Sequence, residues 1–509
     1  MIHLGSRSAL FTDHYQLVMG QLYFREGLAE RRAQFDYFFR ENPDYGTHQA
    51  GFCIAAGLEP LLEWLDTTSF GEAETAALRE LRTAAGEPLF DEAYLDWLVS
   101  SCDFSLLELT SIAEGRVIHP HLPVMSVVGP MAVAQIVETA LLNHLNYATL
   151  IATKAARVRQ SAQSSVVLEF GMRRGAGAAV DEGARAALIG GCNATSNVEA
   201  SVVLGTDPKG THAHSLVQAY LATGGGELEA FRAFARSYPD DCVLLVDTID
   251  TLRSGMPNAI TVFNELRAAG HEPVGVRLDS GDLAYLGVQA ARQLDAAGFP
   301  DASIVLSGDL DELTIWQIRS QIFEEAIRVG LDPTAMLARL VYGVGTRLIT
   351  SHGESALGGV FKLVGVENAE GEWEPAIKLS ENPVKIPIPG AKSVWRLYDH
   401  AGVATVDLVA VPDEDPLGDD DIEAFHPFLD GVSRIIRRSD IARAEALRSD
   451  PRLQRDQGLA MSRQRALDDV AALDPGVRRL VNPHRYHVSL TKAMKERQRT
   501  VIAAVRSRA

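Results

Sequence analysis

Short apolar runs alternate with longer segments of helical period over residues 165–345. The runs are rich in Val, Ile and Leu on both faces, and each ends in a cluster of Gly, Asp, Ser or Arg. The helical segments between them, such as 283–298 and 312–330, end at glycine, a common residue after a last helical turn. Strands that are apolar on both faces and alternate with helices are typical of parallel βα units. The strand candidates are 166–171, 242–247, 273–279, 303–309 and 340–345.

This alternation predicts an α/β fold, with an irregular (β/α) barrel that carries function at the carboxyl ends of its strands. We expect the barrel to span residues 131–355. Residues 1–130 mix helices with short strands, and residues 356–410 are rich in strands and turns. We predict that these two segments together form one smaller α/β domain. The last segment, 411–509, begins with an acidic, proline-containing hinge, and we expect a helical tail after it.

Composition narrows the class of protein. The chain has 509 residues, 46% of them apolar, and a net charge of −19, so it is globular and ill-suited to nucleic acid as a main partner. The N-terminus lacks the apolar core of a signal peptide, and no apolar run is long enough to cross a membrane. The cysteines are dispersed, which is typical of reduced thiols, and we expect a cytoplasmic enzyme without a membrane partner. They are Cys53, Cys102, Cys192 and Cys242.

Charged residues gather at two of the predicted strand ends. Phe170 is followed by Arg173 and Arg174, and an aromatic ring beside two guanidinium groups suits a flat anion or a phosphate. Further along, Arg277 and Asp279 share one strand face by the period of two. These two either hold an anion and a sugar hydroxyl together or form an internal salt bridge.

The segment GTHAHS (210–215) carries two histidines two positions apart. If it ends a strand, His212 and His214 point to one face. Such a pair serves a metal, a proton relay or a nucleophile. In the next strand end, Asp247 and Asp250 precede a helix; capping explains at least one of them, and we give Asp247 a supporting role.

Two glycine-rich turns follow the last two predicted strands, at 307–312 and 342–348. Turns of this kind expose backbone N–H groups and cradle phosphates. The candidate residues in them are Gly308, Gly343, Gly345 and Thr346. Together with the charged strand ends, they predict a pocket for a phosphorylated sugar and an anionic partner.

The order and spacing of these motifs resemble those of the nicotinate phosphoribosyltransferase family over roughly the first 400 residues. The resemblance implies the irregular barrel of the type II phosphoribosyltransferases. It also implies condensation of nicotinate with phosphoribosyl pyrophosphate to nicotinate mononucleotide and pyrophosphate, in NAD salvage. ATP hydrolysis would be coupled through a phosphohistidine, with Mg²⁺ on the pyrophosphate. The motifs include TDHYQLVMG (12–20), FGMRR (170–174), GTHAHS, GVRLDSGDL (275–283) and YGVGT (342–346).

The resemblance also implies roles for single residues. His214 is the phosphorylated histidine, and Asp279 holds the ribose hydroxyls. Tyr15 would reach the pocket of a neighbouring subunit, which implies a homodimer with shared active sites. The residues implied for nicotinate are Tyr15, Phe170, Thr211 and Arg277. Those implied for the phosphoribosyl group are Arg173, Gly308, Gly343, Gly345 and Thr346. No residue is assigned as a metal ligand.

Two departures and three alternatives stand beside this hypothesis. His14 occupies a position where the family usually has Leu, and the chain after about residue 410 matches poorly. A metal-dependent barrel hydrolase would use His212 and His214 with Asp279 or Asp309, although Zn²⁺ needs at least three good ligands. A nicotinate sensor would bind without turnover. Nicotinamide in place of nicotinate is the third alternative, since one arginine does not fix specificity.

Overall fold

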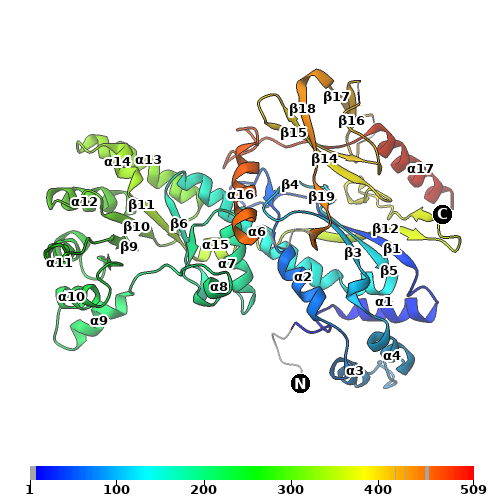
Figure 1. Cartoon of the computed structure of the whole chain (residues 1–509), viewed down its shortest axis with the longest axis horizontal. Coiled ribbons are helices and arrows are strands. Elements are labelled where there is room, and N and C mark those ends of the chain that lie inside the picture. Colours follow the sequence, from blue (N-terminus) through cyan, green and yellow to red (C-terminus); the bar gives the residue numbers. More distant parts are fainter. Residues whose placement is uncertain (1–6, 419, 430, 453–457, 509) are drawn as a thin grey trace. The chain divides into compact units, whose positions relative to one another are not determined.

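The computed structural model describes residues 7–418, 420–429, 431–452 and 458–508. The chain forms two compact units (Figure 1): unit 1 comprises residues 1–153 and 353–509, and unit 2 comprises residues 154–352. Both contain helices and sheets, so the mixed α/β class predicted from the sequence is confirmed. The domain boundaries at 130 and 355 stay predictions.

A six-stranded parallel sheet forms the centre of unit 2, in the order β7-β6-β11-β10-β9-β8. All the strands predicted from the apolar runs are present, each shorter than its run. Since β7 and β8 end this order and no pairing joins them among the described residues, the closed barrel stays a prediction. The strands are β6 (Val166–Glu169), β7 (Ala194–Thr195), β8 (Val243–Leu245), β9 (Gly275–Leu278), β10 (Ser303–Ser307) and β11 (Leu340–Val344).

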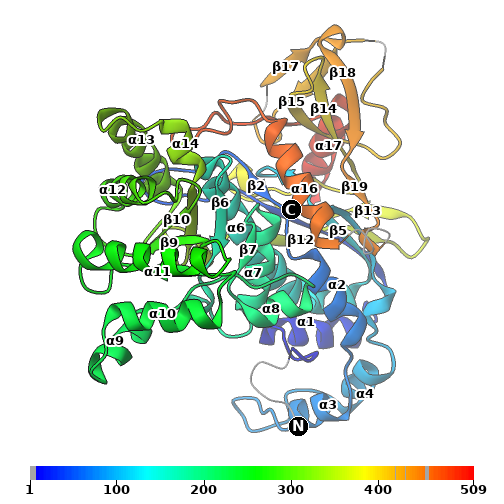
Figure 2. The ribbon, with the colours of Figure 1, turned by 60° about the vertical axis from the view of Figure 1, so that its left-hand side comes forward.

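Helices connect these strands, and those from α10 to α14 form a row beside the sheet (Figures 1 and 2). Both helices predicted from their period are confirmed. The side chain of Asp282 caps the first of them by accepting a hydrogen bond from the backbone N–H of Tyr285. The bounds are α9 (His214–Ala222), α10 (Glu227–Ser237), α11 (Met256–Ala268), α12 (Leu283–Ala296), α13 (Glu312–Arg328), α14 (Pro333–Ala338) and α15 (Thr346–Ile349).

Unit 1 contains an antiparallel sheet in the order β13-β12-β1-β5-β3-β19. Its strands come from both sides of unit 2 in the sequence. The rings of Phe35 and Phe361, from β1 and β12, stack with centroids 4.9 Å apart. The bounds are β1 (Arg32–Phe39), β3 (Glu108–Ile112), β5 (Met125–Pro130), β12 (Gly359–Glu367), β13 (Trp373–Pro375) and β19 (Arg448–Ser449), and α1 (His14–Arg25) precedes them.

The chain after residue 410 is not the helical tail that we expected. It contributes most strands of a second sheet in unit 1, ordered β17-β16-β20-β15-β14-β18, as well as two helices. Strand β18 reads IARAEA and is largely exposed, so its charged side chains hid the strand pattern in the sequence. The bounds are β14 (Ser393–Asp399), β15 (Ala404–Ala410), β16 (Ile422–Phe425), β17 (Ser433–Ile436), β18 (Ile441–Ala446), β20 (Val488–Leu490), α16 (Gly458–Ala471) and α17 (Lys492–Arg508).

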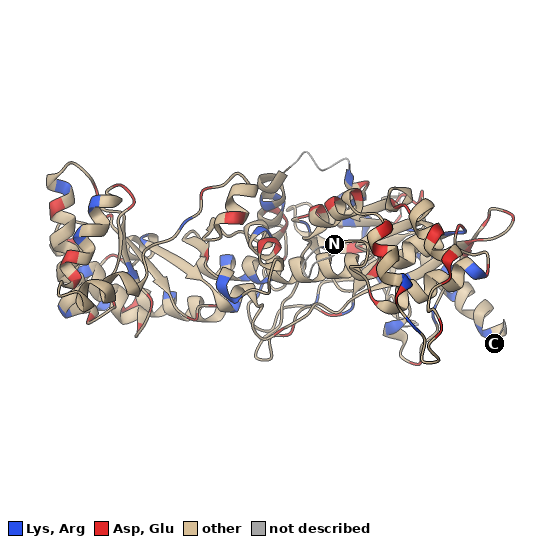
Figure 3. Ribbon diagram, turned by 90° about the horizontal axis from the view of Figure 1, so that it is seen from below, with Lys and Arg blue, Asp and Glu red and all other residues tan. Residues whose placement is uncertain are grey.

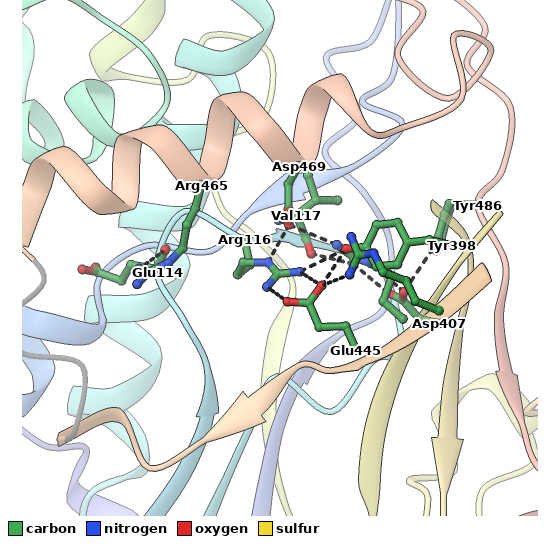
Figure 4. Close-up of polar contacts among 11 residues, drawn as sticks. Glu114, Arg116, Val117, Tyr398, Asp407, Glu445, Arg465, Asp469 and Tyr486 are labelled. Atoms are coloured by element: carbon green, nitrogen blue, oxygen red, sulfur yellow. Dashed lines mark hydrogen bonds and ion pairs between the residues drawn. The ribbon is translucent and has the colours of Figure 1, made fainter. Parts of the chain in front are cut away.

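A network of buried and half-buried ion pairs joins this second sheet to the segment around Arg116 (Figure 4). Arg116 donates to Glu445 at 2.6 Å and to Asp469 at 2.8 Å. Arg396 donates two hydrogen bonds of 2.8 Å to the carboxylate of Asp407. Both members of that second pair are buried, so each charge depends on the other for its stability.

Charge is distributed over both units. Acidic and basic positions both occur along the ribbon of each (Figure 3). Among the described residues, no helix combines the length and the apolar character needed to cross a membrane.

Candidate active site

The side chain of Arg277 organises a polar cluster at the carboxyl ends of the unit 2 strands. Its guanidinium donates to Asp279 at 2.8 Å, to the hydroxyl of Ser307 at 2.9 Å and to the hydroxyl of Thr211 at 2.9 Å. Ser307 in turn donates to Asp279 at 2.5 Å. The salt bridge between Arg277 and Asp279, one of the two alternatives left open by the sequence, is therefore present, as part of a larger cluster.

Asp279 is held as a carboxylate by this cluster. Burial raises the pKa of Asp279, but the hydrogen bond from Ser307 and the charge of Arg277 outweigh it, so the pKa lies below its usual value. Both hydrogen bonds reach Oδ1. Oδ2 accepts none from the described residues and is available to a ligand.

Phe170 lies against the same cluster. The guanidinium carbon of Arg277 is 5.5 Å from the centroid of its ring. A Cβ at Gly343 would be only 2.5 Å from that ring, so glycine leaves the space in which the ring lies. Glu169 fixes the turn: its carboxylate accepts hydrogen bonds from the N–H of Gly171 and, at 2.5 Å, from the hydroxyl of Thr195.

His214 is the first residue of α9, and its Nε2 lies 3.0 Å from Oδ1 of Asp247. The other oxygen of Asp247 accepts from the N–H of Asp279 at 3.0 Å and from the hydroxyl of Ser280 at 2.6 Å. The side chain of Asp247 is 2% exposed and that of His214 is 37% exposed. Asp247 thus connects His214 to the next strand end, and Asp250 is a helix cap, as we expected of at least one of the two.

The segment GTHAHS does not end a strand, so the condition under which its two histidines share one strand face is not met. Residues 206–213 have no regular structure, and α9 begins at His214. Small and polar residues around the two histidines suit a strand exit and a loop equally well, so the period of two was misleading. His212 is buried, and its Nε2 accepts a hydrogen bond from the N–H of Leu245. Among the described residues, no group of His, Cys, Asp and Glu side chains is placed to hold a metal.

The two glycine-rich turns lie at adjacent strands, β10 and β11. Gly308 has a positive φ of 99°, and a Cβ there would be 2.3 Å from the carbonyl oxygen of Asp279. Gly345 precedes α15, which begins at Thr346. Both glycines expose backbone near the Arg277 cluster, as a phosphate-binding turn requires.

An ion pair links these turns. Arg347, just after Thr346, donates to Asp311 at 2.6 Å. The other oxygen of Asp311 caps α13 by accepting from the N–H of Thr314. Sequence reasoning missed this pair, because a charged residue in a helix-capping turn has an ordinary explanation.

Two predicted residues share none of the hydrogen bonds described above. Arg173 is exposed in a short 3₁₀ turn, and it forms no ion pair with any residue that the structure describes. Tyr15 belongs to α1 in unit 1, and this residue is 49% exposed. Ser307 and Ser280, by contrast, were missed; their only signal in the sequence is their position at strand ends beside Gly and Asp.

Comparison with known proteins decides the family. A model of the nicotinate phosphoribosyltransferase N-terminal domain matches residues 10–146, and one of the C-terminal domain matches residues 391–498. The nicotinate phosphoribosyltransferase of Bacillus subtilis is 38% identical over 98% of this chain and 96% of its own length. The chain belongs to the nicotinate phosphoribosyltransferase family. The resemblance stated from the motifs is confirmed, and the expectation that the chain after residue 410 falls outside it is wrong.

Other relatives agree. The human nicotinate phosphoribosyltransferase is 30% identical over 96% of this chain and 95% of its own length. The crystal structure of human nicotinic acid phosphoribosyltransferase covers 96% of this chain and 99% of its own, with a TM-score of 0.76 and 28% identity. A nicotinate-nucleotide pyrophosphorylase structure from Pyrococcus furiosus, 20% identical, covers 92% of this chain and 98% of its own, with a TM-score of 0.59, and shows the fold alone.

Proposed function

We propose that this chain condenses nicotinate with phosphoribosyl pyrophosphate, giving nicotinate mononucleotide and pyrophosphate, in the salvage of NAD. Membership of the family supports the reaction. The structural observation that carries it is the cluster in which Arg277, Asp279 and Ser307 meet beside the ring of Phe170. A cytoplasmic location and an irregular barrel of the type II kind are parts of the same proposal.

Nicotinate binds between aromatic rings. Phe170 provides one ring, and Arg277 at its face meets the carboxylate of the substrate, with the hydroxyl of Thr211 holding one guanidinium nitrogen in place. Tyr15 comes from the second subunit of a homodimer and covers the other face. Its exposed position on α1 leaves it available for that role.

The transfer separates pyrophosphate from C1′ of the ribose. As the C1′–O bond breaks, positive charge develops on the sugar, and the ring nitrogen of nicotinate donates its electron pair to C1′. Asp279 binds the ribose hydroxyls through its available oxygen and stabilises that charge, because its carboxylate is fixed before the reaction begins. Gly308, Gly343, Gly345, Thr346 and Arg173 bind the phosphate groups.

ATP hydrolysis is coupled through His214. In this proposal the Nε2–H of His214 donates its hydrogen bond to Asp247, so the electron pair is on Nδ1, which has no hydrogen bond to any described residue. Nδ1 attacks the γ-phosphorus of ATP, the bond to ADP breaks, and water later takes the phosphoryl group as phosphate. The position of His214 at the first residue of α9 supports this, since negative charge is stabilised at a helix N-terminus.

Mg²⁺ would enter the site bound to the phosphate groups of its substrate. A magnesium ion bound to pyrophosphate would keep phosphate and water oxygens as ligands and would need few protein carboxylates, so we assign it no protein ligand. The ion would neutralise charge on the leaving pyrophosphate. The hydrolase alternative is weakened by His212, whose Nε2 already accepts a backbone hydrogen bond.

The test is pyrophosphate release from the purified protein with phosphoribosyl pyrophosphate and Mg²⁺. Nicotinate and nicotinamide are compared, with and without ATP, for the wild type and His214→Ala. Release with nicotinate that rises with ATP only in the wild type supports both parts of the proposal. Release that is indifferent to ATP and to the substitution keeps the transfer and overturns the coupling. If pyrophosphate is released with neither base, the transferase proposal fails and the hydrolase and the sensor become the leading hypotheses.

A further inference from the structure

His212 attaches the irregular segment before α9 to the edge of the parallel sheet. Its Nε2 accepts a hydrogen bond of 3.1 Å from the backbone N–H of Leu245, the last residue of β8. Strand β8 pairs with β9 and ends the sheet order, so this N–H faces the open side of the strand. Leu245 is buried, and the imidazole supplies the acceptor that a further strand would otherwise provide.

The hydrogen bonds of His212 define its protonation state. A backbone N–H can only donate, so Nε2 is unprotonated, and Nδ1 carries the proton that it donates to the carbonyl oxygen of Ala213 at 3.3 Å. The rings of Phe231 and Phe234 lie beside the imidazole, with centroids at 6.0 and 4.9 Å. Burial lowers the pKa of His212, and the nearby charges of Arg277 and His214 lower it further, although the Ala213 carbonyl opposes them. The imidazole is therefore neutral and able to accept.

The two histidines are attached in register. His212 contacts Leu245, and two residues later His214 contacts Asp247, so both contacts join positions 33 apart in the sequence. The hydrogen bond of His212 fixes the position of the segment 206–213 along β8. That position brings His214 to Asp247. We propose that His212 is a positioning residue that places His214 on Asp247 and thereby sets the rate at which His214 accepts a phosphoryl group. This inference rests on the proposed function.

Two amide substitutions separate the hydrogen bond from the mere presence of a polar side chain. In His212→Gln the side-chain oxygen reaches about as far as Nε2, so it accepts from Leu245 as the imidazole does. In His212→Asn the oxygen reaches only about as far as Nδ1, so the Leu245 N–H loses its acceptor. Gln and Asn are similar in polarity, and a third variant, His212→Leu, removes every acceptor while it keeps an apolar contact with Phe231 and Phe234.

The first measurement is hydrogen exchange by mass spectrometry on the full-length protein, over a peptide that contains Leu245. Exchange there is expected to be faster in His212→Asn and His212→Leu than in the wild type, and close to the wild type in His212→Gln. Unchanged exchange in both Asn and Leu variants would overturn the attachment. This readout needs no substrate, so it holds whether or not the proposed reaction is correct.

The second measurement is labelling of the protein by ATP that carries a labelled γ-phosphate, beside pyrophosphate release without ATP. His212→Asn is expected to slow labelling at least about tenfold, since small misplacements cost much of a rate, while release without ATP falls less than about threefold. His212→Gln is expected to restore labelling. Labelling of His212→Asn at the wild-type rate would overturn the inference. If the wild type is not labelled, the phosphohistidine of the proposed function fails, and the exchange data alone decide the attachment.

Discussion

One carboxylate oxygen of Asp247 lies 3.0 Å from Nε2 of His214. The other accepts hydrogen bonds from the backbone N–H of Asp279 and the hydroxyl of Ser280, at the next strand end. The proposed phosphoryl acceptor and the proposed ribose ligand, Asp279, therefore share one buried anchor. Any movement of the imidazole that displaces Asp247 also displaces the N–H of Asp279. This gives a physical route by which a phosphoryl group on His214 changes the phosphoribosyl site.

Asp247→Asn is predicted to abolish most phosphorylation. The two oxygens of Asp247 serve three donors, on His214, Asp279 and Ser280. Asparagine has only one acceptor oxygen, and its NH₂ group would face donors in place of the second. Each hydrogen bond to a charged group is worth about 1.5–3 kcal/mol, so labelling by ATP should fall at least about tenfold. The control is Asp250→Asn, since asparagine also caps a helix well. Equal labelling of both variants contradicts the role given to Asp247.

Arg277→Lys is predicted to weaken nicotinate binding. The planar guanidinium of Arg277 donates to three side chains at once, and a lysine ammonium lacks that geometry. We expect the KM for nicotinate to rise at least about tenfold, from the loss of a charged hydrogen bond. Arg232→Lys, on an exposed pair with Glu265 in the same unit, is the matched control and should leave KM unchanged. An unchanged KM in Arg277→Lys would remove Arg277 from the nicotinate site.

The Asp311–Arg347 pair should matter for phosphoribosyl pyrophosphate. Asp311→Asn keeps the cap on α13 but weakens the link to Arg347, so the two glycine-rich turns lose their fixed spacing. The KM for phosphoribosyl pyrophosphate should rise severalfold, with the KM for nicotinate nearly constant. Asp332→Asn, at the cap of α14, is the control. A rise in both KM values, or in neither, would speak against a role for this pair in the phosphate site.

The sequence predicted most of unit 2 because its strands are apolar on both faces and its turns carry Gly, Asp and Arg at the strand ends. It missed Ser307, since a serine beside glycine is explained by the turn itself. The sequence did not show that His212 lies in a loop, because the residues around it suit a strand end and a loop equally well. It also missed the strands after residue 410, where charged side chains cover the exposed face. The role proposed for Tyr15 would need a second subunit, which no pattern within one chain can place.

Unit 1 should depend strongly on the buried pair of Arg396 and Asp407. Asp407→Asn leaves the buried guanidinium with Asp469, at 3.1 Å, as its remaining carboxylate, so unfolding should become easier by about 3 kcal/mol. The exposed pair of Arg25 and Asp91 gives the control, and Asp91→Asn should cost less than about 1 kcal/mol. Urea unfolding followed by circular dichroism measures both. Similar losses in the two variants would contradict the importance of this pair.

Glu445 should contribute a pH-dependent part of the stability of unit 1. Burial raises its pKa, but hydrogen bonds from Arg116, Tyr398 and Arg443 outweigh it and lower the pKa from 4.5 to about 2. Because the folded-state pKa is the lower one, the stabilisation is fully present above pH 4.5 and is lost as the pH falls towards about 2. The stability difference between the wild type and Glu445→Gln should shrink over that range. A difference that stays constant with pH would contradict the lowered pKa.

The most direct test of the central claim is identification of the nucleotide product. The purified protein is given equal concentrations of nicotinate and nicotinamide together with phosphoribosyl pyrophosphate, Mg²⁺ and ATP. The nucleotide products are then separated and identified by mass spectrometry. We predict nicotinate mononucleotide in large excess, with pyrophosphate released in equal amount. Nicotinamide mononucleotide as the main product, or no nucleotide at all, would contradict the account.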